Sequence, residues 1–465
     1  MVGELAPALN GSALASFRDA FRGPIVLPAD DGYDDARRVW NGMIDRRPAL
    51  IARAIDVADI ASAVRFGREK DLPIAVRSGG HSLPGLSTCD DGIVIDVSRL
   101  TGASVDPDRR TARVNGGALL GELDDAAQAY GLACPVGVVS HTGVAGLTLG
   151  GGVGRLQRKL GLTIDNLRAV ELVTADGRQV RASAEDNADL FWGLRGAGWN
   201  FGIATGFEFD LHPVGPNLTR VLLIHPFSAA PELFAFFRDF AATAPWEISG
   251  LVTTFHALPA EDFPPEVAGQ LVAAISVTYC GRPEDADRDL APLTAFGKPV
   301  VATVQPQPYL EVQRIFDDEM AWGHRVYAKS VYVDSAPDRL IGALVDVASA
   351  MPTGGSAFIG ALGGAIASVP EDATAYAGRS AAFEVGVDCT WDDPALDADF
   401  VTWARTAMKG IEPYRTTGVY ANSLGDAGED IARAIYGDAK YERLRALKRT
   451  WDPDNVFRLN QNIRP

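Results

Sequence analysis

The sequence predicts an α+β protein with two lobes. Its 465 residues are more than one domain usually holds, and they allow two large cores. Short β-type runs alternate with helical patterns as far as residue 211, whereas the chain after Pro213 and Pro216 carries longer β-runs with helices between them. This second pattern is typical of helices packed on a mainly antiparallel sheet. We therefore expect a second lobe over residues 217–410.

The first lobe is predicted from short β-branched runs and amphipathic helices. Asp56 can cap the first helix, and Gly131 is a natural stop for the second. Asp176-Gly177 is the strongest short turn signal of the chain and predicts a hairpin. The expected strands are 50–53, 73–77, 93–96, 111–115, 167–174, 178–183 and 198–211, and the expected helices are 56–69, 119–130 and 187–194.

The second lobe is predicted from β-runs that recur between helical patterns. Several of these runs alternate apolar and polar residues, which is typical of a strand with one buried face. The expected strands of this lobe are 251–256, 272–279, 325–333, 358–367 and 383–391.

Composition and charge exclude several classes of protein. Hydrophobic residues make up 47% and charged residues 22%, which is ordinary for a globular chain and unlike a disordered or fibrous one. The formal net charge of -17 opposes binding to nucleic acid, because phosphate contacts need clustered Lys and Arg. We therefore expect a small-molecule function without a nucleic-acid partner.

The cysteines and the N-terminal text suggest a cellular compartment. Cysteines occur far apart and form no C-x-x-C pair, so we expect buried, reduced thiols and no metal site. The first 22 residues lack the basic start and apolar run of a signal peptide, and no apolar stretch reaches the roughly 18 residues of a membrane span. We expect a cytoplasmic protein without a membrane partner, and the oligomeric state stays open. The four cysteines are Cys89, Cys134, Cys280 and Cys389.

Two glycine clusters carry the strongest functional signal. The first reads RSGGHS at residues 77–82, and the second reads GGGVG at residues 150–154. Glycine lets the backbone approach a ligand closely, so that successive amide N–H groups can surround a pyrophosphate. The imidazole of His81 is a nucleophile near neutral pH, and an electrophilic cofactor methyl can alkylate it. Together the clusters predict a bound flavin tethered through His81.

The glycines do not match the fingerprint of a dinucleotide-binding fold. Gly150 and Gly152 are followed by Arg155 where the third glycine belongs. The glycines between Gly196 and Gly202 have the wrong spacing and precede a predicted strand, whereas the fingerprint opens a helix. We therefore expect no Rossmann site.

Three separated segments resemble, in the same order, motifs of the vanillyl-alcohol-oxidase superfamily in its berberine-bridge-enzyme-like branch of FAD-linked oxidoreductases. They are residues 74–100, residues 137–167, and a C-terminal segment with Tyr420-Ala421-Asn422 and residues 451–465. The resemblance implies the two-lobed FAD-binding fold of that superfamily. It also implies that the tail returns to the first lobe, so that residues 1–216 and 411–465 form the FAD-binding domain and residues 217–410 the substrate-binding domain.

The resemblance implies that His81 is bonded to the 8α-methyl of FAD. Many relatives add a second bond from a cysteine, but the matching position here is Val139, which cannot form a thioether. Cys134 lies five positions upstream and could substitute only in a rebuilt loop, so we expect a single covalent attachment. His141 is either a neighbour of the ring or pyrophosphate or a structural loop residue.

The same resemblance implies a set of residues around FAD. Asn200, Gly202 and Ile203 match the segment at the adenine side, although a tight strand entry would use the same residues. The complete set expected to bind the cofactor is His81, Arg77, Ser78, Gly79, Gly80, Ser82, Gly143, Gly146, Gly150, Gly151, Gly152, Gly154, Asn200, Gly202, Ile203, Tyr420 and Asn422.

Oxidation of a substrate requires a base over the flavin ring, and two residues are candidates. Tyr420 matches a family position that often holds an active-site tyrosine, and Asn422 beside it could hold a substrate or flavin oxygen. Glu384 shares one strand face with Gly386 and Asp388, and burial would raise its pKa. A core tyrosine and two solvated acids are the structural alternatives. We favour Tyr420, because a motif locates it.

Three further side chains near one predicted strand are weaker candidates for contact with substrate. They are His324, Tyr327 and Lys329.

The predicted activity is that of an FAD-dependent oxidase. A small alcohol, amine or secondary metabolite would give a hydride to the flavin, and O2 would take the electrons and become hydrogen peroxide. The alternatives are an oxidative cyclase or monooxygenase-like enzyme, a dehydrogenase with another acceptor, and a flavin-binding protein without turnover.

Overall fold

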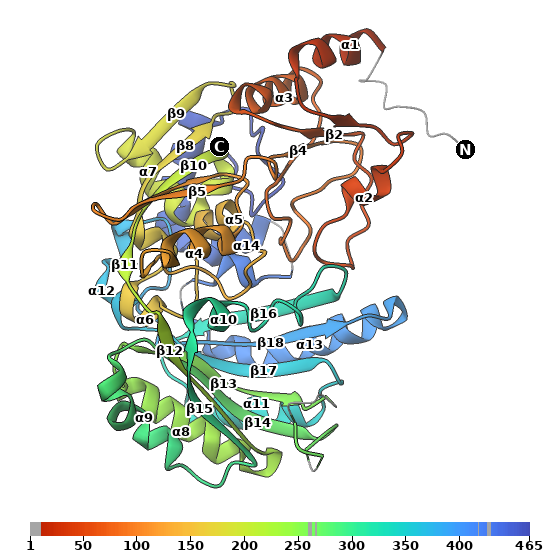
Figure 1. Ribbon diagram of the computed structural model, residues 1–465. Coiled ribbons are helices and arrows are strands. Elements are labelled where there is room, and N and C mark those ends of the chain that lie inside the picture. Colours follow the sequence, from red (N-terminus) through yellow and green to blue (C-terminus); the bar gives the residue numbers. More distant parts are fainter. Residues whose placement is uncertain (1–10, 259–262, 266, 417, 426–428) are drawn as a thin grey trace.

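The computed structural model describes residues 11–258, 263–265, 267–416, 418–425 and 429–465. Two lobes lie one above the other in Figure 1. The first lobe holds two sheets and a short two-stranded ribbon built from residues 25–213, and the second holds one seven-stranded sheet built from residues 217–391. The α+β class and the two-lobed arrangement are as predicted.

A small four-stranded sheet begins the first lobe. Its strands β2 and β3 run parallel to β4 between them, and β1 pairs antiparallel with β2. Helix α3 begins after Asp56, whose side chain accepts a hydrogen bond from the backbone N of Asp59 at 2.9 Å, as predicted. The elements are α1 (Gly11–Ala20), β1 (Ile25–Val26), α2 (Tyr33–Arg37), β2 (Leu50–Arg53), α3 (Val57–Glu69), β3 (Ile74–Arg77) and β4 (Ile93–Asp96).

A five-stranded antiparallel sheet follows, in the order β5-β6-β10-β8-β9. Strands β8 and β9 form the hairpin predicted at Asp176-Gly177, and Gly177 takes the left-handed φ of 79° that this turn requires. The elements are β5 (Ala103–Asp106), β6 (Thr111–Asn115), α4 (Leu120–Gln128), β7 (Leu132–Ala133), α5 (Val144–Leu149), α6 (Gln157–Leu160), β8 (Leu167–Val173), β9 (Gln179–Ser183), α7 (Ala188–Ala197), β10 (Ile203–Asp210) and β11 (His212–Pro213).

The second lobe is a seven-stranded sheet in the order β15-β12-β14-β13-β17-β18-β16, and every neighbouring pair is antiparallel. Its elements are β12 (Asn217–Pro226), α8 (Ala230–Thr243), β13 (Ile248–His256), β14 (Leu271–Tyr279), α9 (Ala286–Thr294), β15 (Val301–Pro308), α10 (Tyr309–Gln313), β16 (Arg325–Val333), α11 (Asp338–Ser349), β17 (Gly355–Ala361), α12 (Ala365–Ser368), β18 (Phe383–Trp391) and α13 (Asp397–Ile411).

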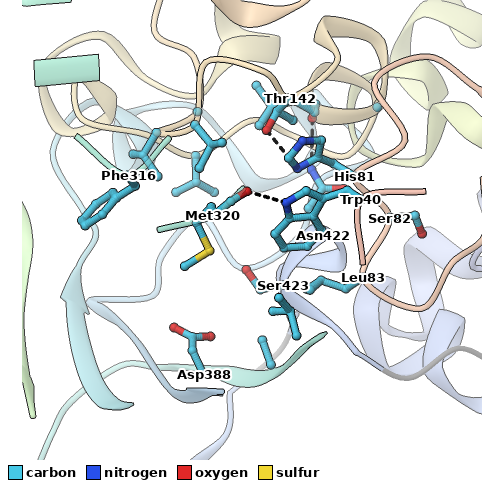
Figure 2. A pocket seen from close by; sticks show the side chains of 18 of the residues that line it. Trp40, His81, Ser82, Leu83, Thr142, Phe316, Met320, Asp388, Asn422 and Ser423 are labelled. Atoms are coloured by element: carbon cyan, nitrogen blue, oxygen red, sulfur yellow. Dashed lines mark hydrogen bonds between the residues drawn. The ribbon is translucent and has the colours of Figure 1, made fainter. Parts of the chain in front are cut away.

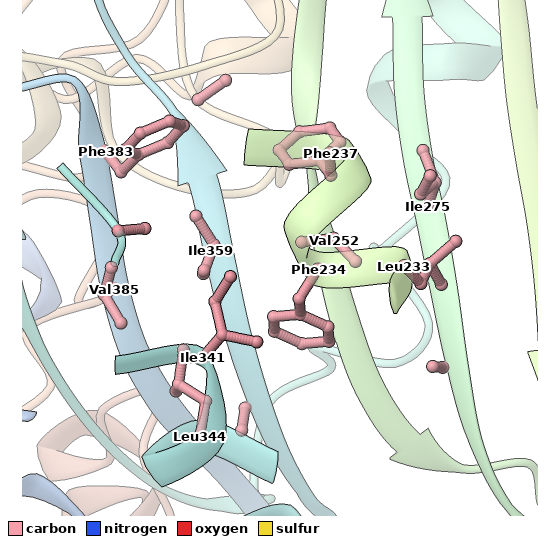
Figure 3. Packing of buried hydrophobic residues seen from close by; sticks show 14 of the residues in the cluster. Leu233, Phe234, Phe237, Val252, Ile275, Ile341, Leu344, Ile359, Phe383 and Val385 are labelled. Atoms are coloured by element: carbon pink, nitrogen blue, oxygen red, sulfur yellow. The ribbon is translucent and has the colours of Figure 1, made fainter. Parts of the chain in front are cut away.

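One face of this sheet carries the main core of the second lobe. Helices α8, α9, α11 and α13 pack their apolar sides against it. Figure 3 shows Phe234 and Phe237 of α8 against Val252, and Ile341 of α11 beside Ile359. All five are buried, so the helices close this face and the other face is left for the first lobe.

The C-terminal tail packs on the first lobe. Helix α14 (Glu429–Trp451) places Ile435 and Leu444 in the same apolar cluster as Phe201 and Phe209 of the five-stranded sheet region. The buried ammonium of Lys448 donates to the backbone oxygens of Asn200 and Phe457 and to Asp452. These contacts join the end of the chain to residues more than 200 positions earlier.

Several predicted strands begin or end at different residues, and two of these differences are large. The predicted strand 358–367 ends at Ala361, because Gly363 and Gly364 take left-handed φ values of 77° and 58° and α12 follows. The predicted strand 198–211 begins at Ile203, after a 3₁₀ turn. The prediction lacks the short strands β1, β5, β7 and β11 of the first lobe and the longer strands β12 and β15 of the second.

Candidate FAD site

A cavity of about 1340 Å³ lies between the lobes. The loops after β3 and around residues 137–155 line it from the first lobe, and the helix-free face of the seven-stranded sheet lines it from the second. Residues 420–423 of the tail also reach it. A concave site between two domains is where small ligands usually bind.

His81 stands at the centre of the first-lobe wall. Its ring stacks on Trp40 with 4.7 Å between centroids, and Trp322 approaches edge-on. Its Nε2 lies 2.8 Å from Nδ1 of His141. Its Nδ1 lies 3.4 Å from Oγ1 of Thr142 (Figure 2). Burial, together with the nearby His141, lowers the pKa of His81 to about 3, so the imidazole is neutral and keeps a lone pair.

Contacts from the second lobe fix the first-lobe loop that carries Ser140 and His141, and His141 contacts His81. Asp317 accepts hydrogen bonds from the backbone N of Ser140, at 2.8 Å, and from its hydroxyl. The indole N–H of Trp40 donates to the backbone oxygen of Met320 at 2.6 Å. His141 lies 3.3 Å from the backbone oxygen of Asp317. The imidazole is therefore placed by contacts that cross between the lobes.

Glycine is required where the two loops of this wall meet. A Cβ on Gly79 would collide with the backbone of Gly143, and a Cβ on Gly143 would collide with Gly79 and with the Ser78 side chain. Ser78 is fixed in turn, because its hydroxyl donates to the backbone oxygen of Gly116 at 2.9 Å. Here the glycines let the two loops pack backbone to backbone, whereas the sequence suggested glycine for close approach to a ligand.

The second glycine cluster packs against other parts of the protein. A Cβ on Gly150 would meet Asn422, one on Gly151 would meet the Tyr376 ring, and one on Gly152 would meet Thr163. Three consecutive glycines thus let the tail and the second lobe pack closely on this loop. Only beyond them, from Val153 on, does the chain line the cavity again.

Most of the predicted site residues share the cavity, and some do not. Arg77 is tied to Asp96 by an ion pair at 2.6 Å, and buried Asn200 accepts from the backbone N of Ile463 at 3.0 Å. In the described part of the chain, Arg77, Asn200, Gly150, Gly151 and Gly152 are not among the residues that line the cavity. Those that line it are Ser78, Gly79, Gly80, His81, Ser82, Gly143, Gly146, Gly154, Gly202, Ile203, Glu384, Tyr420 and Asn422.

Val139 and Cys134 have different environments. Val139 lines the cavity, whereas Cys134 is fully buried, and burial raises the pKa of its thiol well above the ordinary value. A thiolate is the reactive form of cysteine, so Cys134 is held unreactive. All four cysteines are buried and free, as the sequence predicted.

Tyr420 is buried at the tail side of the cavity. Its hydroxyl accepts from the backbone N of Val153 at 3.2 Å and from Nδ2 of Asn422 at 3.0 Å. Burial is the main cause that raises the pKa of Tyr420 to about 12. The phenol therefore keeps its proton near neutral pH, and Tyr420 is built to hold hydrogen bonds.

Strand β18 brings two carboxyl groups into the cavity. Glu384 accepts from the hydroxyl of Ser330 at 2.6 Å, and burial raises its pKa. Asp388 points into the cavity in Figure 2. Burial, with the charges of Glu384 and Glu319, raises the pKa of Asp388 to about 7. The cavity thus contains an acid that gains and loses a proton near neutral pH.

Only one of the three weaker candidates lines the cavity. His324 does so, and its Nδ1 lies 2.6 Å from a carboxylate oxygen of Asp392. Tyr327 belongs to the apolar core on the helix side of β16, where its hydroxyl accepts from Arg405 at 3.2 Å. Lys329 is not among the lining residues of the described chain. The expectation of substrate contact is therefore wrong for Tyr327, because its strand face carries the core.

Two family models match the chain. The model described as FAD binding domain matches residues 48–183, and the one described as berberine and berberine like matches residues 419–464. An FAD-linked oxidoreductase of Dictyostelium discoideum is 31% identical over 459 residues, with 97% of this chain and 96% of the relative covered. The chain belongs to the berberine-bridge-like FAD-linked oxidoreductases.

Two further relatives support this membership. The (R)-6-hydroxynicotine oxidase of Paenarthrobacter nicotinovorans is 30% identical, with 96% of this chain and 97% of the relative covered. The solved structure of Physcomitrella patens BBE-like 1 is similar with a TM-score of 0.86 and 25% identity, and 98% of each chain is covered. This protein is therefore an enzyme that uses FAD, with the fold that the sequence resemblance implied.

The cavity of this oxidoreductase fits FAD. The close approach at Gly79 and Gly143 can present backbone N–H groups to a pyrophosphate, and the neutral ring of His81 faces the same space. Gly202 and Ile203 line the cavity at the five-stranded sheet. Among the described residues, no helix is long and apolar enough to cross a membrane.

Sequence reasoning underrated two residues of this site. Asp388 is predicted on the correct strand face, but its pKa is raised mainly by burial in the assembled cavity and, to a smaller extent, by Glu384 and by Glu319 from a loop about 70 positions earlier. Asp317 was not considered, because nothing in its local sequence shows that it crosses to the first-lobe loop. Both depend on contacts between distant segments.

Proposed function

We propose that this oxidoreductase is an oxidase in which FAD is attached covalently through His81 alone. The observation that carries the proposal is the neutral, stacked imidazole of His81 in the wall of the cavity. The substrate would be a small alcohol, amine or secondary metabolite, and O2 would be the final acceptor. When bound, FAD supplies a two-electron acceptor for a hydride.

The hydrogen bonds of His81 favour Nδ1 as the attachment atom. Its Nε2 is engaged with His141 at 2.8 Å, whereas the contact of Nδ1 with Thr142 is 3.4 Å long. Attachment replaces one hydrogen of the cofactor methyl by this nitrogen. This bond formation would release the replaced hydrogen as a proton together with two electrons, and O2 would take the electrons.

The carboxyl groups of β18 are the proposed proton acceptors. The carbon of a CH–OH or CH–NH group loses a hydride, and its oxygen or nitrogen loses a proton, so a base must stand nearby. Asp388 titrates near pH 7, where a base is most effective, and Glu384 lies on the same strand face. Two electrons and two protons then convert O2 to hydrogen peroxide.

The motif favours Tyr420 as the base, but its contacts support a role in hydrogen bonding. A phenol with a pKa near 12 is a weak base at neutral pH. Its hydroxyl can still donate one hydrogen bond while it accepts from Val153 and Asn422. We propose that Tyr420 orients the substrate or cofactor and relays a proton to the carboxyl groups.

We further propose that residues 1–216 and 411–465 form the FAD-binding domain and residues 217–410 the substrate-binding domain. The shared apolar cluster of the tail and the five-stranded sheet supports the first part. The self-contained core of the seven-stranded sheet with α8, α9, α11 and α13 supports the second.

The attachment is tested by denaturation. Acid precipitation of the parent enzyme should leave a yellow pellet, and mass spectrometry of a digest should place the mass of FAD on the peptide that contains His81. In His81→Ala the flavin should wash off, whereas His212→Asn, outside the cavity, should keep it. A colourless parent pellet, or FAD on a peptide with Cys134, would contradict the proposal.

The acceptor is tested by anaerobic reduction followed by air. A panel of sugars, amines and aromatic alcohols is screened for bleaching of the flavin without oxygen. For an oxidase, the colour returns in air and one hydrogen peroxide forms per turnover. Bleaching without recovery in air would instead indicate a dehydrogenase with another acceptor, and a product with a new ring or an added oxygen would indicate a cyclase or a monooxygenase-like enzyme.

A further inference from the structure

Arg155 is a half-buried cation, and two of its side-chain nitrogens lack hydrogen-bond partners. It follows the second glycine cluster directly and lines the cavity. Its Nε and Nη2 are buried and have no hydrogen-bond partner among the described residues. A guanidinium has five donors, and those left unpaired away from water cost free energy. An anionic ligand in the cavity would supply the missing acceptors.

The surroundings of Arg155 do not neutralise its charge. The guanidinium carbon lies 5.1 Å from the centre of the Phe316 ring, which leaves the edge of the guanidinium unpaired. Burial and the like charge of Arg220 lower the pKa of Arg155 to about 10, so it stays charged at neutral pH. In the described chain, no carboxylate acts on that pKa. A second cation nearby makes the burial more costly still.

The floor of the cavity is therefore polarised. Arg220 lies on β12, while Glu384 and Asp388 lie on β18. Four strand spacings separate β12 from β18 in the sheet, roughly 19 Å at about 4.8 Å each. An anionic group is attracted to the arginine end and repelled from the carboxyl end. A molecule with one anionic end would thus bind in one direction.

We propose that Arg155 binds a carboxylate of the substrate, so that the oxidised alcohol or amine belongs to the class of carboxylic acids. This rests on the proposed function, because it takes the carboxyl groups of β18 as the site of oxidation. Arginine pairs with a carboxylate through two parallel hydrogen bonds, and Nε with Nη2 forms one such fork. The unpartnered atoms of Arg155 are that pair.

The phosphates of FAD are the other anions that this cavity would hold. The proposed cradle for them is the loop pair of Gly79 and Gly143, which belongs to the wall around His81. Arg155 instead lies beside Phe316, and its charge acts on Arg220 of the sheet floor. An interaction of Arg155 with the flavin is treated below as an outcome that overturns the proposal.

Ligand binding to the oxidised holoenzyme tests the proposal without turnover. The probes are benzoate against benzamide and hexanoate against hexanamide, which differ in charge but little in shape. Affinities come from calorimetry and from the change in flavin absorption. The variants are Arg155→Gln and Arg155→Lys. The control is Arg168→Gln, which removes an exposed arginine whose guanidinium lies 2.7 Å from Asp210.

The parent and the control should prefer each carboxylate to its amide. Arg155→Gln should weaken carboxylate binding by about 10- to 150-fold, the range for a lost hydrogen bond to a charged group, and leave amide binding unchanged. The carboxylate affinity of Arg155→Lys should lie between those of the parent and of Arg155→Gln, because an ammonium keeps the charge but cannot form the two parallel hydrogen bonds. Flavin content and flavin potential should match the parent in both variants.

Three results would overturn the proposal. They are a parent without carboxylate preference, an Arg155→Gln variant that keeps it, and a variant with altered flavin potential but parental carboxylate affinity. The last result would assign Arg155 to the flavin. Binding is measured in the resting enzyme and needs no turnover. A parent enzyme without a covalent flavin or without oxidase turnover would therefore contradict the proposed function, while the carboxylate affinities could still be measured.

Discussion

The two faces of the seven-stranded sheet differ in what covers them. On β18, Val385 and Val387 point into a core closed by helices of the same lobe, whereas Glu384 and Asp388 point into the cavity. On β18 the helix face holds only buried residues, which are Phe383, Val385, Val387, Cys389 and Trp391. The cavity face is covered by loops and a tail that belong to distant parts of the chain. Along β18, odd-numbered residues therefore belong to the core, and Glu384 and Asp388 line the cavity, where we propose that they accept protons.

This difference teaches where each property can be changed. A side chain removed from the helix face leaves a void among close-packed neighbours and costs folding free energy. A carboxyl group altered on the cavity face leaves that core untouched and, on the proposed function, should slow proton transfer. Substitutions on alternate residues should therefore separate stability from activity.

The largest expected effect comes from removing the tail that covers the cavity face. A chain that ends at residue 410 loses Tyr420 and Asn422 from the cavity and Ile435 and Leu444 from the first-lobe core. We expect it to lose both flavin retention and stability. Flavin absorbance per protein and the midpoint of thermal unfolding measure the two losses.

A chain that still holds FAD in stoichiometric amount after this truncation would contradict the discontinuous domain. The matched comparison is a chain that ends at residue 464, which keeps every element of the tail.

The carboxyl groups of the cavity face should give the next largest effect. A base in position contributes about 10²- to 10⁴-fold to a rate, or about 2.7 to 5.4 kcal/mol at 1.36 kcal/mol per decade. We expect Asp388→Asn to slow anaerobic flavin reduction by a factor within this range. Glu384→Gln and Tyr420→Phe should also slow it, but by smaller factors. The flavin spectrum should stay that of the oxidised parent. If all three variants reduce their flavin at the parental rate, the base lies elsewhere, and His324 is the next candidate.

The pH dependence of the same rate identifies the base. With a pKa of about 7, Asp388 is an acceptor only above that value, so the parental rate should fall as the pH drops through about 7. Asp388→Asn should remove this limb. Since the folded pKa is raised above the unfolded one, ionisation of Asp388 costs stability as the pH rises from about 4 to 7. The variant should therefore be no less stable than the parent at pH 8.

The helix face should respond with stability alone. Ile359 on β17 is fully buried among helix side chains, and Ile359→Ala should cost about 2 to 5 kcal/mol of unfolding free energy. Ser356 on the same strand lines the cavity, and Ser356→Ala should change stability by about 0.5 kcal/mol or less. Urea unfolding measures both. A rate of flavin reduction that falls as much in Ile359→Ala as in Asp388→Asn would break the division between the faces.

Elements with a strong local pattern were predicted to the residue. The strands 50–53, 93–96, 325–333 and 383–391 have the predicted bounds, because β-branched or alternating text stops abruptly at polar or turn residues. Strand β15 was not predicted, because it is an exposed edge strand with two prolines and two glutamines. Its own residues therefore give no sign that it pairs with β12.

The residues that belong to motifs could be predicted, but the surroundings of the site residues could not. His81, Glu384 and Tyr420 were named from the text, and they line one cavity although more than 300 positions separate the first two. The titration of Asp388 near pH 7 and the unpaired state of Arg155 could not be predicted, because both follow from what other segments place around them. Burial is a property of the assembled fold, and it decides both.

The contacts of Asp317 have a consequence for maturation of the enzyme. Asp317 of the second lobe holds Ser140 and lies against His141, which in turn contacts the ring of His81. A chain whose second lobe has not yet folded lacks this support for the imidazole. If His81 carries the flavin, covalent attachment waits for both lobes to dock, and the colour that survives denaturation counts the molecules that once assembled correctly.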